Sequence, residues 1–164
     1  DSVPEVVIAA SCSKNMGLYR ERTGLAIFVC NNERDADATA SQAKSAARRI
    51  YSMPPAHGAI IAGRILADSN LRNVWELELN AMCERINGLR AQFRDQLQVR
   101  TGRDFSFIAR EKGMFSFLGL TTEQAQQVRA DRSLYMLDSS RINIASLNTG
   151  NMASVIDAVA SVLV

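Results

Sequence analysis

This sequence is poor in lysine, histidine and proline, with three lysines, one histidine and three prolines among 164 residues. It has no run of about 18 or more apolar residues, so it predicts no membrane-spanning helix and no membrane partner. A formal net charge of +2 is too small to predict nucleic acid as a partner. The cysteines, Cys12, Cys30 and Cys83, lack metal-ligand spacing. We therefore predict no metal site, and reduced thiols as in cytoplasmic proteins.

The first residues, Asp1 to Pro4, contain no initiator methionine and no signal-peptide pattern, and an apolar run follows almost at once. This beginning predicts a piece of a longer protein. Hydrophobic residues make up 47% of the chain and charged residues 22%, which is typical of a globular domain. A chain of this length can bury one good core or two small ones.

Among the scarce lysines, Lys14 has the most informative surroundings. It follows the apolar run Val6 to Ala10, within the string SCSKNMGLYRERTG. A strand that ends in hydroxyls and a lysine, and then returns as a second strand, places an amine at the rim of a sheet, where open α/β folds bind ligands. A lysine partly withdrawn from water can serve as a neutral amine that condenses with an aldehyde.

The same string supplies groups that bind phosphate. The hydroxyls of Ser11 and Ser13 and the guanidinium of Arg22 predict a phosphate-binding site beside Lys14. An amine next to a phosphate-binding site indicates an attachment site for pyridoxal phosphate. Two simpler interpretations stay open, namely Lys14 as a solvated loop residue and Arg22 in a surface ion pair with Glu21.

Apolar periodicity predicts the elements of the first part of the chain. They are a strand over 6–10, a strand over 25–30 that is buried on both faces, a polar loop over 31–35, a helix over 36–49 and a short helix over 58–66. Pro54 and Pro55 separate the two helices, because the residue before a proline is pushed out of helical geometry.

The longest predicted element is a helix with Ser69 as its N-cap. Apolar residues recur along it every three or four positions and predict one core-facing stripe of about seven turns. The stripe comprises Leu71, Trp75, Leu79, Met82, Ile86, Leu89, Phe93 and Leu97. A helix of roughly 40 Å, at ~1.5 Å per residue, can link two subdomains. We predict a domain boundary near residue 80.

The last third of the sequence predicts a compact α+β unit. Its expected strands lie over 105–109 and 114–118, which form a hairpin, and over 134–137 and 141–147. Thr121 and Gln124 have capping-box spacing and predict a helix to about Asp131. Asn148 is the expected cap of a final helix. The apolar stripe of that helix includes Met152, Val155, Ile156, Val159 and Val162.

Three further segments carry candidate binding residues. Arg48 and Ser52 lie in ARRIYSMPPAHGA, where the adjacent Arg49 leaves open that both arginines serve only the helix dipole and solvent. Arg141 opens a predicted strand in SSRINIASL, and a buried arginine at that place requires an anion. Phe115, in GMFSFLGL, is by itself a core residue.

These four segments, in this order, resemble the class I aspartate and aromatic amino-acid aminotransferases, which are pyridoxal-phosphate enzymes of fold type I. The resemblance covers essentially the whole chain and corresponds to the C-terminal portion of that family. It implies an α/β fold in which residues 1–80 are the C-terminal part of the cofactor-binding large domain. Residues 81–164 are then the small α+β C-terminal domain, joined to the first by the long helix.

The resemblance implies the roles around the cofactor. Lys14 is the catalytic residue, which holds pyridoxal phosphate as a Schiff base and moves the substrate proton. Ser11, Ser13 and Arg22 bind the cofactor phosphate. The implied reaction is a ping-pong transamination between a dicarboxylic or aromatic amino acid and a 2-oxo acid, part of amino-acid metabolism in the cytoplasm. Which donor is preferred stays open.

The resemblance also implies the substrate-binding residues. Arg141 takes the α-carboxylate, and Arg48 takes the side-chain carboxylate of a dicarboxylic substrate. Phe115 lines the substrate side of the pocket. Arg48 and Ser52 lie in a segment that reaches into the neighbouring active site, which implies a homodimer whose active sites are shared across the interface.

Two alternatives stay open. A different fold type I enzyme, such as a lyase or decarboxylase, would keep Lys14 and use the arginines for other substrates. Alternatively, the chain is a truncated, non-catalytic fragment that needs a separate N-terminal portion. The family aspartate that pairs with the pyridine nitrogen of the cofactor lies upstream of the first residue of this chain, and this carboxylate makes the cofactor an effective electron sink.

Overall fold

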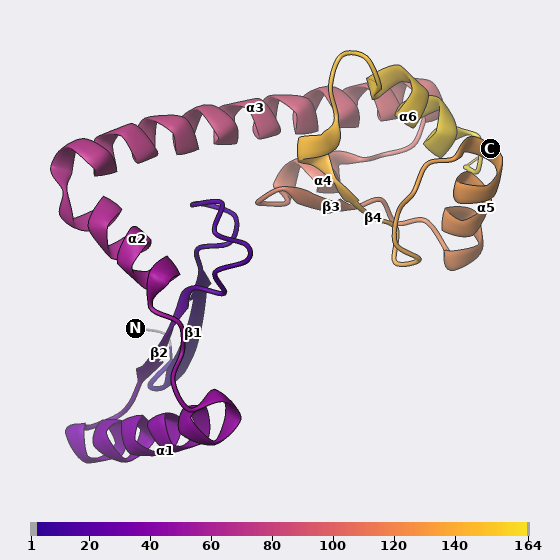
Figure 1. Cartoon of the computed structure of the whole chain (residues 1–164). Coiled ribbons are helices and arrows are strands. Elements are labelled where there is room, and N and C mark those ends of the chain that lie inside the picture. Colours follow the sequence, from indigo (N-terminus) through magenta and orange to yellow (C-terminus); the bar gives the residue numbers. More distant parts are fainter. Residues whose placement is uncertain (1–2, 164) are drawn as a thin grey trace. The chain divides into compact units, whose positions relative to one another are not determined.

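The computed structural model describes residues 3–163; Asp1, Ser2 and Val164, which fall at the ends of the two predicted domains, lie outside the described residues. The chain divides into two compact units, the first ending at Leu79 and the second beginning at Asn80. The elements that begin in the first unit are β1 (Val6–Ser11), β2 (Gly24–Val29), α1 (Glu33–Tyr51), α2 (His57–Ala67) and α3 (Ser69–Thr101), and α3 continues into the second unit (Figure 1). The mixture of helices and strands confirms the predicted α/β class at this coarse level.

The second unit follows α3 with shorter elements. They are α4 (Ser106–Arg110), β3 (Phe115–Phe117), α5 (Thr122–Arg132), β4 (Arg141–Asn143), the 3₁₀-helix η1 (Ile144–Ser146) and α6 (Met152–Ala160). Among the residues that the structure describes, no helix is long and apolar enough to cross a bilayer.

Strands β1 and β2 form an antiparallel hairpin in which Val6 pairs with Val29 and Ser11 with Gly24. Every residue of both strands is exposed. The prediction that the second strand is buried on both faces is therefore wrong. A continuous apolar run makes burial of both faces possible, but burial also needs elements that cover them. Helix α1 contacts β2 and leaves the rest of the hairpin open.

Helix α1 begins earlier than predicted, at Glu33, so the expected polar loop over 31–35 is wrong in its second half. Asn32 is the N-cap, and its Oδ1 accepts a hydrogen bond from the Asp35 backbone N–H at 3.0 Å. The acidic residues assigned to a loop favour the first helical turn, because carboxylates stabilise a helix N-terminus. Helix α2 is confirmed to within one residue at each end.

Helix α3 is confirmed, but its cap and its stripe differ from the prediction. The cap is Asp68 rather than Ser69, since Asp68 Oδ1 accepts from the backbone N–H of Asn70 at 2.9 Å. Of the predicted stripe, Leu71 and Met82 are exposed, whereas its last members are fully buried. The stripe is therefore core only in the C-terminal part of the helix, where the second unit packs against it.

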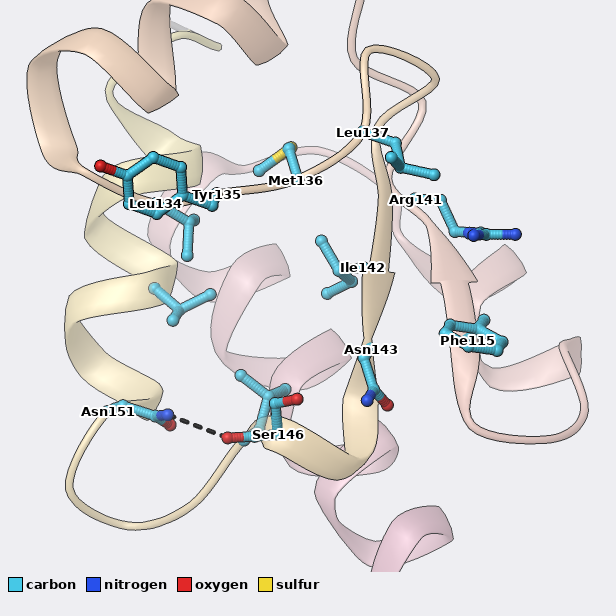
Figure 2. Close-up of a pocket in the computed structure, with 12 residues that line it drawn as sticks. Phe115, Leu134, Tyr135, Met136, Leu137, Arg141, Ile142, Asn143, Ser146 and Asn151 are labelled. Atoms are coloured by element: carbon cyan, nitrogen blue, oxygen red, sulfur yellow. Dashed lines mark hydrogen bonds between the residues drawn. The ribbon is translucent and has the colours of Figure 1, made fainter. Parts of the chain in front are cut away.

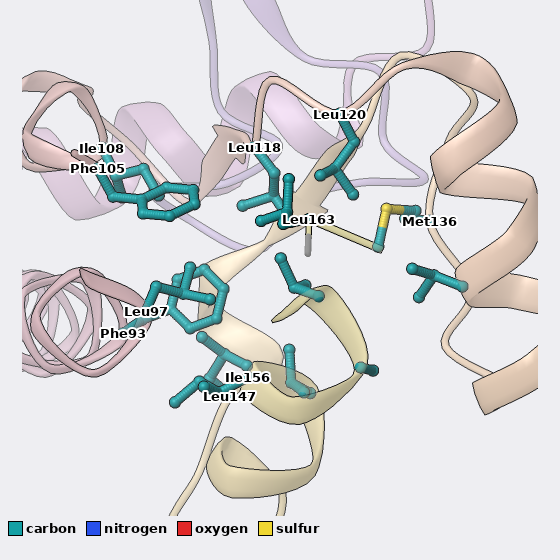
Figure 3. Close-up of a cluster of buried hydrophobic side chains, with 14 of the residues drawn as sticks. Phe93, Leu97, Phe105, Ile108, Leu118, Leu120, Met136, Leu147, Ile156 and Leu163 are labelled. Atoms are coloured by element: carbon teal, nitrogen blue, oxygen red, sulfur yellow. The ribbon is translucent and has the colours of Figure 1, made fainter. Parts of the chain in front are cut away.

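The core of the second unit is one cluster of apolar side chains from α3, α4, α5, η1, α6 and the loops between them (Figure 3). Phe93 and Leu97 of α3 are 0% exposed. They lie near Phe105, Ile108 and Leu118 in Figure 3. The cluster also contains Leu120, Ala125, Val128, Met136, Ile144, Leu147, Met152, Val155, Ile156, Ala158, Val159 and Leu163. Four members of the stripe predicted for the final helix are thus confirmed as core.

The predicted strand over 105–109 is wrong, because these residues form most of helix α4. Phe105 and Ile108 are both buried, and a spacing of three places residues on one face of a helix. In this short segment, the apolar residues that suggested a strand instead mark one face of a helix. Strand β3 pairs instead with the distant β4, antiparallel, with Phe115 opposite Asn143.

The predicted strand over 134–137 is also wrong, since these residues form no strand within the described chain. The strand expected over 141–147 ends at Asn143. There, Asn143 Oδ1 accepts from the Ala145 backbone N–H at 3.0 Å. A short amide side chain that bonds the backbone two residues on competes with the strand ladder, and the chain turns into η1.

The capping box of α5 is confirmed. Thr121 Oγ1 accepts from the Gln124 N–H at 3.2 Å, and Gln124 Oε1 accepts from the Thr121 N–H at 3.0 Å. The final helix begins at Met152 rather than directly after Asn148. Asn148 Oδ1 accepts from the N–H groups of Gly150 at 2.8 Å and Asn151 at 3.1 Å, so Asn148 caps the turn that leads into the helix.

Candidate functional site

Lys14 lies in the loop that joins β1 to β2. Its side chain is exposed, so the expectation that this amine is partly withdrawn from water is wrong in this structure. The Nζ atom lies 4.4 Å from the centroid of the Tyr19 ring. An ammonium over an aromatic face is attracted by the ring quadrupole. Tyr19 therefore holds the lysine side chain over the loop.

Ser11 and Ser13 form a hydroxyl pair just before Lys14. Ser11 Oγ donates to Ser13 Oγ at 3.0 Å and accepts from the Ser13 backbone N–H at 3.1 Å. Ser13 is 8% exposed, while Ser11 lies at the surface. The two hydroxyls predicted to bind an anion are thus adjacent in space as well as in sequence.

Arg22 lies on the far side of the same loop and is exposed. Its Nη1 donates to the Tyr19 carbonyl at 3.1 Å. Tyr19 therefore contacts both Lys14, through its ring, and Arg22, through its backbone. The backbone of Arg22 adopts φ 51°, the left-handed region that costs non-glycine residues energy.

The carboxylate of Glu21, the alternative partner for Arg22, points to helix α2. Glu21 Oε2 lies 2.9 Å from His57 Nδ1. Next to His57, a Cβ on Gly58 would overlap Thr23 Oγ1 and the Glu21 side chain. The end of the lysine loop therefore packs closely on the beginning of α2, and this close approach requires glycine at position 58.

Arg48 and Ser52 lie at the end of α1 and are both exposed. The Ser52 N–H donates to the Arg48 carbonyl at 3.0 Å. Ser52 has φ 62°, which ends the helix sharply. The neighbouring Arg49 donates to Ser45 Oγ at 3.2 Å, one turn back along its own helix.

Arg141 and Phe115 lie together in the second unit. The guanidinium carbon of Arg141 is 4.8 Å from the centroid of the Phe115 ring. Figure 2 shows both side chains on one side of strands β4 and β3, with Ile142 directed to the other side. Arg141 is exposed rather than buried, so that part of the prediction is wrong. Both residues line a pocket of about 440 Å³, together with residues 134–137 and Asn143.

Sequence reasoning missed Arg90, a 3% exposed arginine in α3 that supports strand β3. Its guanidinium donates to Ser116 Oγ and to the Gly113 carbonyl. Glu111 Oε2 lies 3.6 Å away. Burial lowers the pKa of Arg90, and the charge of Glu111 opposes this shift. A charged residue at the edge of a predicted apolar stripe was the available signal.

The candidate residues thus form three groups, of which Arg48 and Ser52, at the end of α1 in the first unit, are one. The first unit gathers Ser11, Ser13, Lys14 and Arg22 on one loop, and the second places Arg141 against Phe115. An amine, two hydroxyls and a guanidinium fit a ligand with an aldehyde and a phosphate. The guanidinium beside the pocket of the second unit fits a carboxylate.

The family model for aminotransferases of class I and II matches residues 1–159. Aspartate aminotransferase of Escherichia coli is 44% identical over 160 residues, which are 97% of this chain and 40% of the relative. Aromatic-amino-acid aminotransferase of Paracoccus denitrificans is 43% identical over 147 residues, 89% of this chain and 37% of the relative.

Solved structures agree with these relatives. A structure of an aromatic amino acid aminotransferase with 3-indolebutyric acid has a TM-score of 0.90 and 40% identity, and covers 99% of this chain and 41% of that one. An aromatic-amino-acid aminotransferase from Burkholderia pseudomallei, covalently bound to pyridoxal phosphate, has a TM-score of 0.86 and 38% identity, and covers 98% and 40% of the two chains. The chain spans about 40% of the length of the relatives that it matches. It belongs to the aminotransferase family of classes I and II, as the four segments predicted.

Proposed function

We propose that this chain supplies the cofactor lysine and the substrate arginines of a pyridoxal-phosphate-dependent aminotransferase that acts on dicarboxylic or aromatic amino acids. The observation that carries the proposal is the loop from Ser11 to Arg22. It places an exposed lysine amine on a loop with a hydroxyl pair and a guanidinium. A relative of this family is covalently bound to pyridoxal phosphate, which is the kind of ligand that these groups fit.

In this proposal, Lys14 attaches the cofactor and, when free, moves the proton of the substrate α-carbon as a general base and acid. Ser11, Ser13 and Arg22 bind the phosphate, and the forked guanidinium suits this group better than a lysine would. Pyridoxal phosphate, when bound, supplies a ring that withdraws electrons from the substrate α-carbon. The reaction then proceeds as two half-reactions, in which a first amino acid leaves as a ketoacid before a second ketoacid binds.

Arg141 binds the substrate α-carboxylate in this proposal, and Phe115 lines the substrate side of the pocket. The stacking of Arg141 on the Phe115 ring fixes the guanidinium without using its N–H donors. These donors remain suited to a carboxylate, which two N–H groups of one guanidinium can hold side by side. When a substrate is held at both of its ends, the bond to be broken has a fixed orientation.

Arg48 and Ser52 contribute to the active site of a second copy in a cytoplasmic homodimer, by this proposal. The surroundings of Arg48 support an interface. Ile50 is 78% exposed and Met53 is 80% exposed, and Tyr51 between them is also exposed. Large apolar side chains that gather at the surface mark interaction sites. From this apolar surface, Arg48 would reach into the active site of the second copy. There it would bind the side-chain carboxylate of the substrate.

The two units correspond, in the same proposal, to two parts of one enzyme. The first is the C-terminal part of the cofactor-binding large domain, and the second is the small α+β domain. Helix α3 is continuous through the change of unit at Leu79. Its lack of proline over 33 residues supports a direct helical link between the two parts.

Borohydride reduction in the presence of pyridoxal phosphate tests the central step. We expect a phosphopyridoxyl label on Lys14, located by peptide mapping, and little label on Lys44 or Lys112. The matched control is Lys14→Arg, which keeps the charge and removes the reactive amine. Label spread evenly over the three lysines would contradict the proposal.

Amino transfer is measured with the chain mixed with the N-terminal portion of the E. coli relative. A panel of amino donors with 2-oxoglutarate separates aminotransferase from lyase or decarboxylase activity. We expect transfer from aspartate or from an aromatic amino acid. Release of carbon dioxide or ammonia without amino transfer would favour the alternative enzymes. Label on Lys14 only in the mixture would show that the chain alone is an incomplete fragment that needs its N-terminal portion.

A further inference from the structure

We propose that Trp75 is a positioning residue that holds the Lys14 loop against the first turns of helix α3. The inference rests on the proposed role of Lys14 as the cofactor-attachment residue. Trp75 Nε1 donates a hydrogen bond of 2.7 Å to the backbone carbonyl of Asn15. Asn15 directly follows Lys14, so the bond fixes the peptide unit next to the reactive lysine.

The loop has few other bonds that could fix this peptide unit. Its two ends are joined by the Cys12 N–H, which donates to the Thr23 carbonyl at 3.0 Å. Its middle is turned by the bond from the Leu18 N–H to the Cys12 carbonyl at 3.2 Å, and by Gly17 at φ +67°. These bonds close the loop but leave residues 13–16 without strand pairing. The indole bond therefore restrains the part of the loop that carries the lysine.

The side chain of Asn15 gives a second reason to expect that the indole bond restrains the loop. Asn15 Oδ1 is buried and has no hydrogen-bond partner in the described part of the chain. The Asn15 backbone carbonyl is satisfied by the indole, which is a donor only. Removing that donor would leave both oxygens of Asn15 unsatisfied in a half-buried place, which is unfavourable. We therefore expect the loop to rearrange when the indole is lost.

Trp75 is also well suited to restrain the lysine loop. Trp75 comes from α3, a helix whose backbone is held by its own hydrogen bonds, and it lies 60 residues from its acceptor. An indole has two rotatable side-chain bonds, so little freedom is lost when it is ordered. A rigid support of this kind holds a reactive group near one geometry, and small displacements of such a group slow a reaction.

The chain contains a single tryptophan, so its indole N–H gives one NMR signal, which needs no assignment. In the full chain labelled with ¹⁵N-tryptophan, we expect one indole N–H signal that exchanges with solvent at least tenfold more slowly than a free indole. Attaching pyridoxal phosphate to Lys14 by reduction should shift this signal. The same treatment of Lys14→Arg, in which Lys44 and Lys112 can still react, should leave it in place. An indole that exchanges like free tryptophan would overturn the inference.

The variant Trp75→Phe keeps an aromatic ring and removes the donor. We expect label to reach Lys14 about fivefold more slowly, the factor that corresponds to one net hydrogen bond, with the same final peptide labelled. Arg85→Met is the matched control, because Arg85 also lies on α3 and donates to a distant backbone carbonyl, that of Leu147, at 3.1 Å. Its labelling rate should equal that of the unaltered chain.

The outcomes separate the two proposals. Equal labelling rates for Trp75→Phe and the unaltered chain would overturn the role of Trp75 while leaving that of Lys14 in place. Equal slowing in Trp75→Phe and Arg85→Met would show a general loss of stability and would also overturn it. Absence of label on Lys14 both in the unaltered chain and in its mixture with the N-terminal portion of the E. coli relative would overturn the proposed function itself, and the role of Trp75 with it.

Discussion

The two units each contain one antiparallel pair of strands, but only the second pair contains buried or half-buried residues. In the first unit, all residues of β1 and β2 are exposed. In the second unit, Ser116 in β3 is 0% exposed, and Ile144, which follows β4, is also fully buried. Helix α3 repeats the contrast along its own length, with an exposed Leu71 and a buried Phe93.

Backbone pairing and burial are therefore separate properties of a strand. The two strands of the hairpin in the first unit pair along their length and still expose Ile8, Ile27 and Phe28. The second unit closes its own core, so its stability depends on contacts within the described residues. Substitutions should therefore have unequal effects in the two units.

The largest expected effect is that of Phe93→Ala. Phe93 is 0% exposed, and truncating such a ring leaves a cavity that costs about 3–5 kcal/mol. Ile27→Ala is the matched truncation in the first unit, where the side chain is 41% exposed, and we expect it to cost about 0.5 kcal/mol or less. Urea unfolding followed by circular dichroism measures both. Equal losses would contradict the contrast between the units.

Arg90→Met should lower the free energy of unfolding of the second unit by about 2–3 kcal/mol, because Ser116 Oγ and the Gly113 carbonyl lose a buried, charged donor. Arg94→Met, which removes a pair with the adjacent Asp95 at the surface, should cost well under about 1 kcal/mol. Thermal unfolding distinguishes them. A loss for Arg90→Met as small as that for Arg94→Met would mean that the buried network is dispensable.

Gly58→Ala tests the close packing of helix α2 on the end of the lysine loop. A Cβ there would overlap Thr23 and Glu21, and overpacking of this kind costs about 1–3 kcal/mol. Gly63→Ala lies in the same helix with open space around the added carbon, and should stabilise by about 0.5–1 kcal/mol. The fluorescence of Trp75 during urea unfolding reports on this unit. Stabilisation by both substitutions would show that α2 does not press on the loop.

The smallest effect concerns pH. A side-chain hydrogen bond from Arg129, with a second from Gln126, lowers the pKa of Asp138 below its ordinary 3.8. The unfolded chain therefore binds a proton more readily, and stability rises with pH in this range. The contribution is complete above pH 3.8 and is lost as pH falls through the lower pKa of the folded state. Asp138→Asn should flatten this part of the stability profile, measured by urea unfolding from pH 2 to about pH 5. An unchanged slope would contradict the assignment.

Sequence reasoning succeeded where the signal was local. The capping box of Thr121 and Gln124, the break before Pro54 and the apolar face of the final helix each depend on neighbours within a few residues. It failed at 105–109, because five residues are too few to distinguish the two-residue period of a strand from the apolar face of a helix. It also failed for burial of β2, because burial depends on which elements cover a strand.

The same distinction between local and long-range signals applies to the candidate site. Short strings drew attention to Lys14, Arg48, Phe115 and Arg141, because each is embedded in a recognisable segment, and the roles of these residues stay predictions. Trp75 escaped notice as a partner of the lysine loop, since its acceptor is 60 residues away. Such contacts follow from the tertiary structure and leave no mark in local spacing. The exposure of Lys14 and Arg141 likewise depends on what surrounds them.

The left-handed backbone at Arg22 sets two selection pressures against each other. Glycine adopts φ 51° without the steric cost that arginine bears there. A randomised library sorted only for well-folded chains should enrich glycine at this codon. The same library sorted for capture of pyridoxal phosphate should return arginine, if its guanidinium binds the phosphate as proposed. Position 22 is therefore where laboratory evolution would register a trade-off between stability and activity.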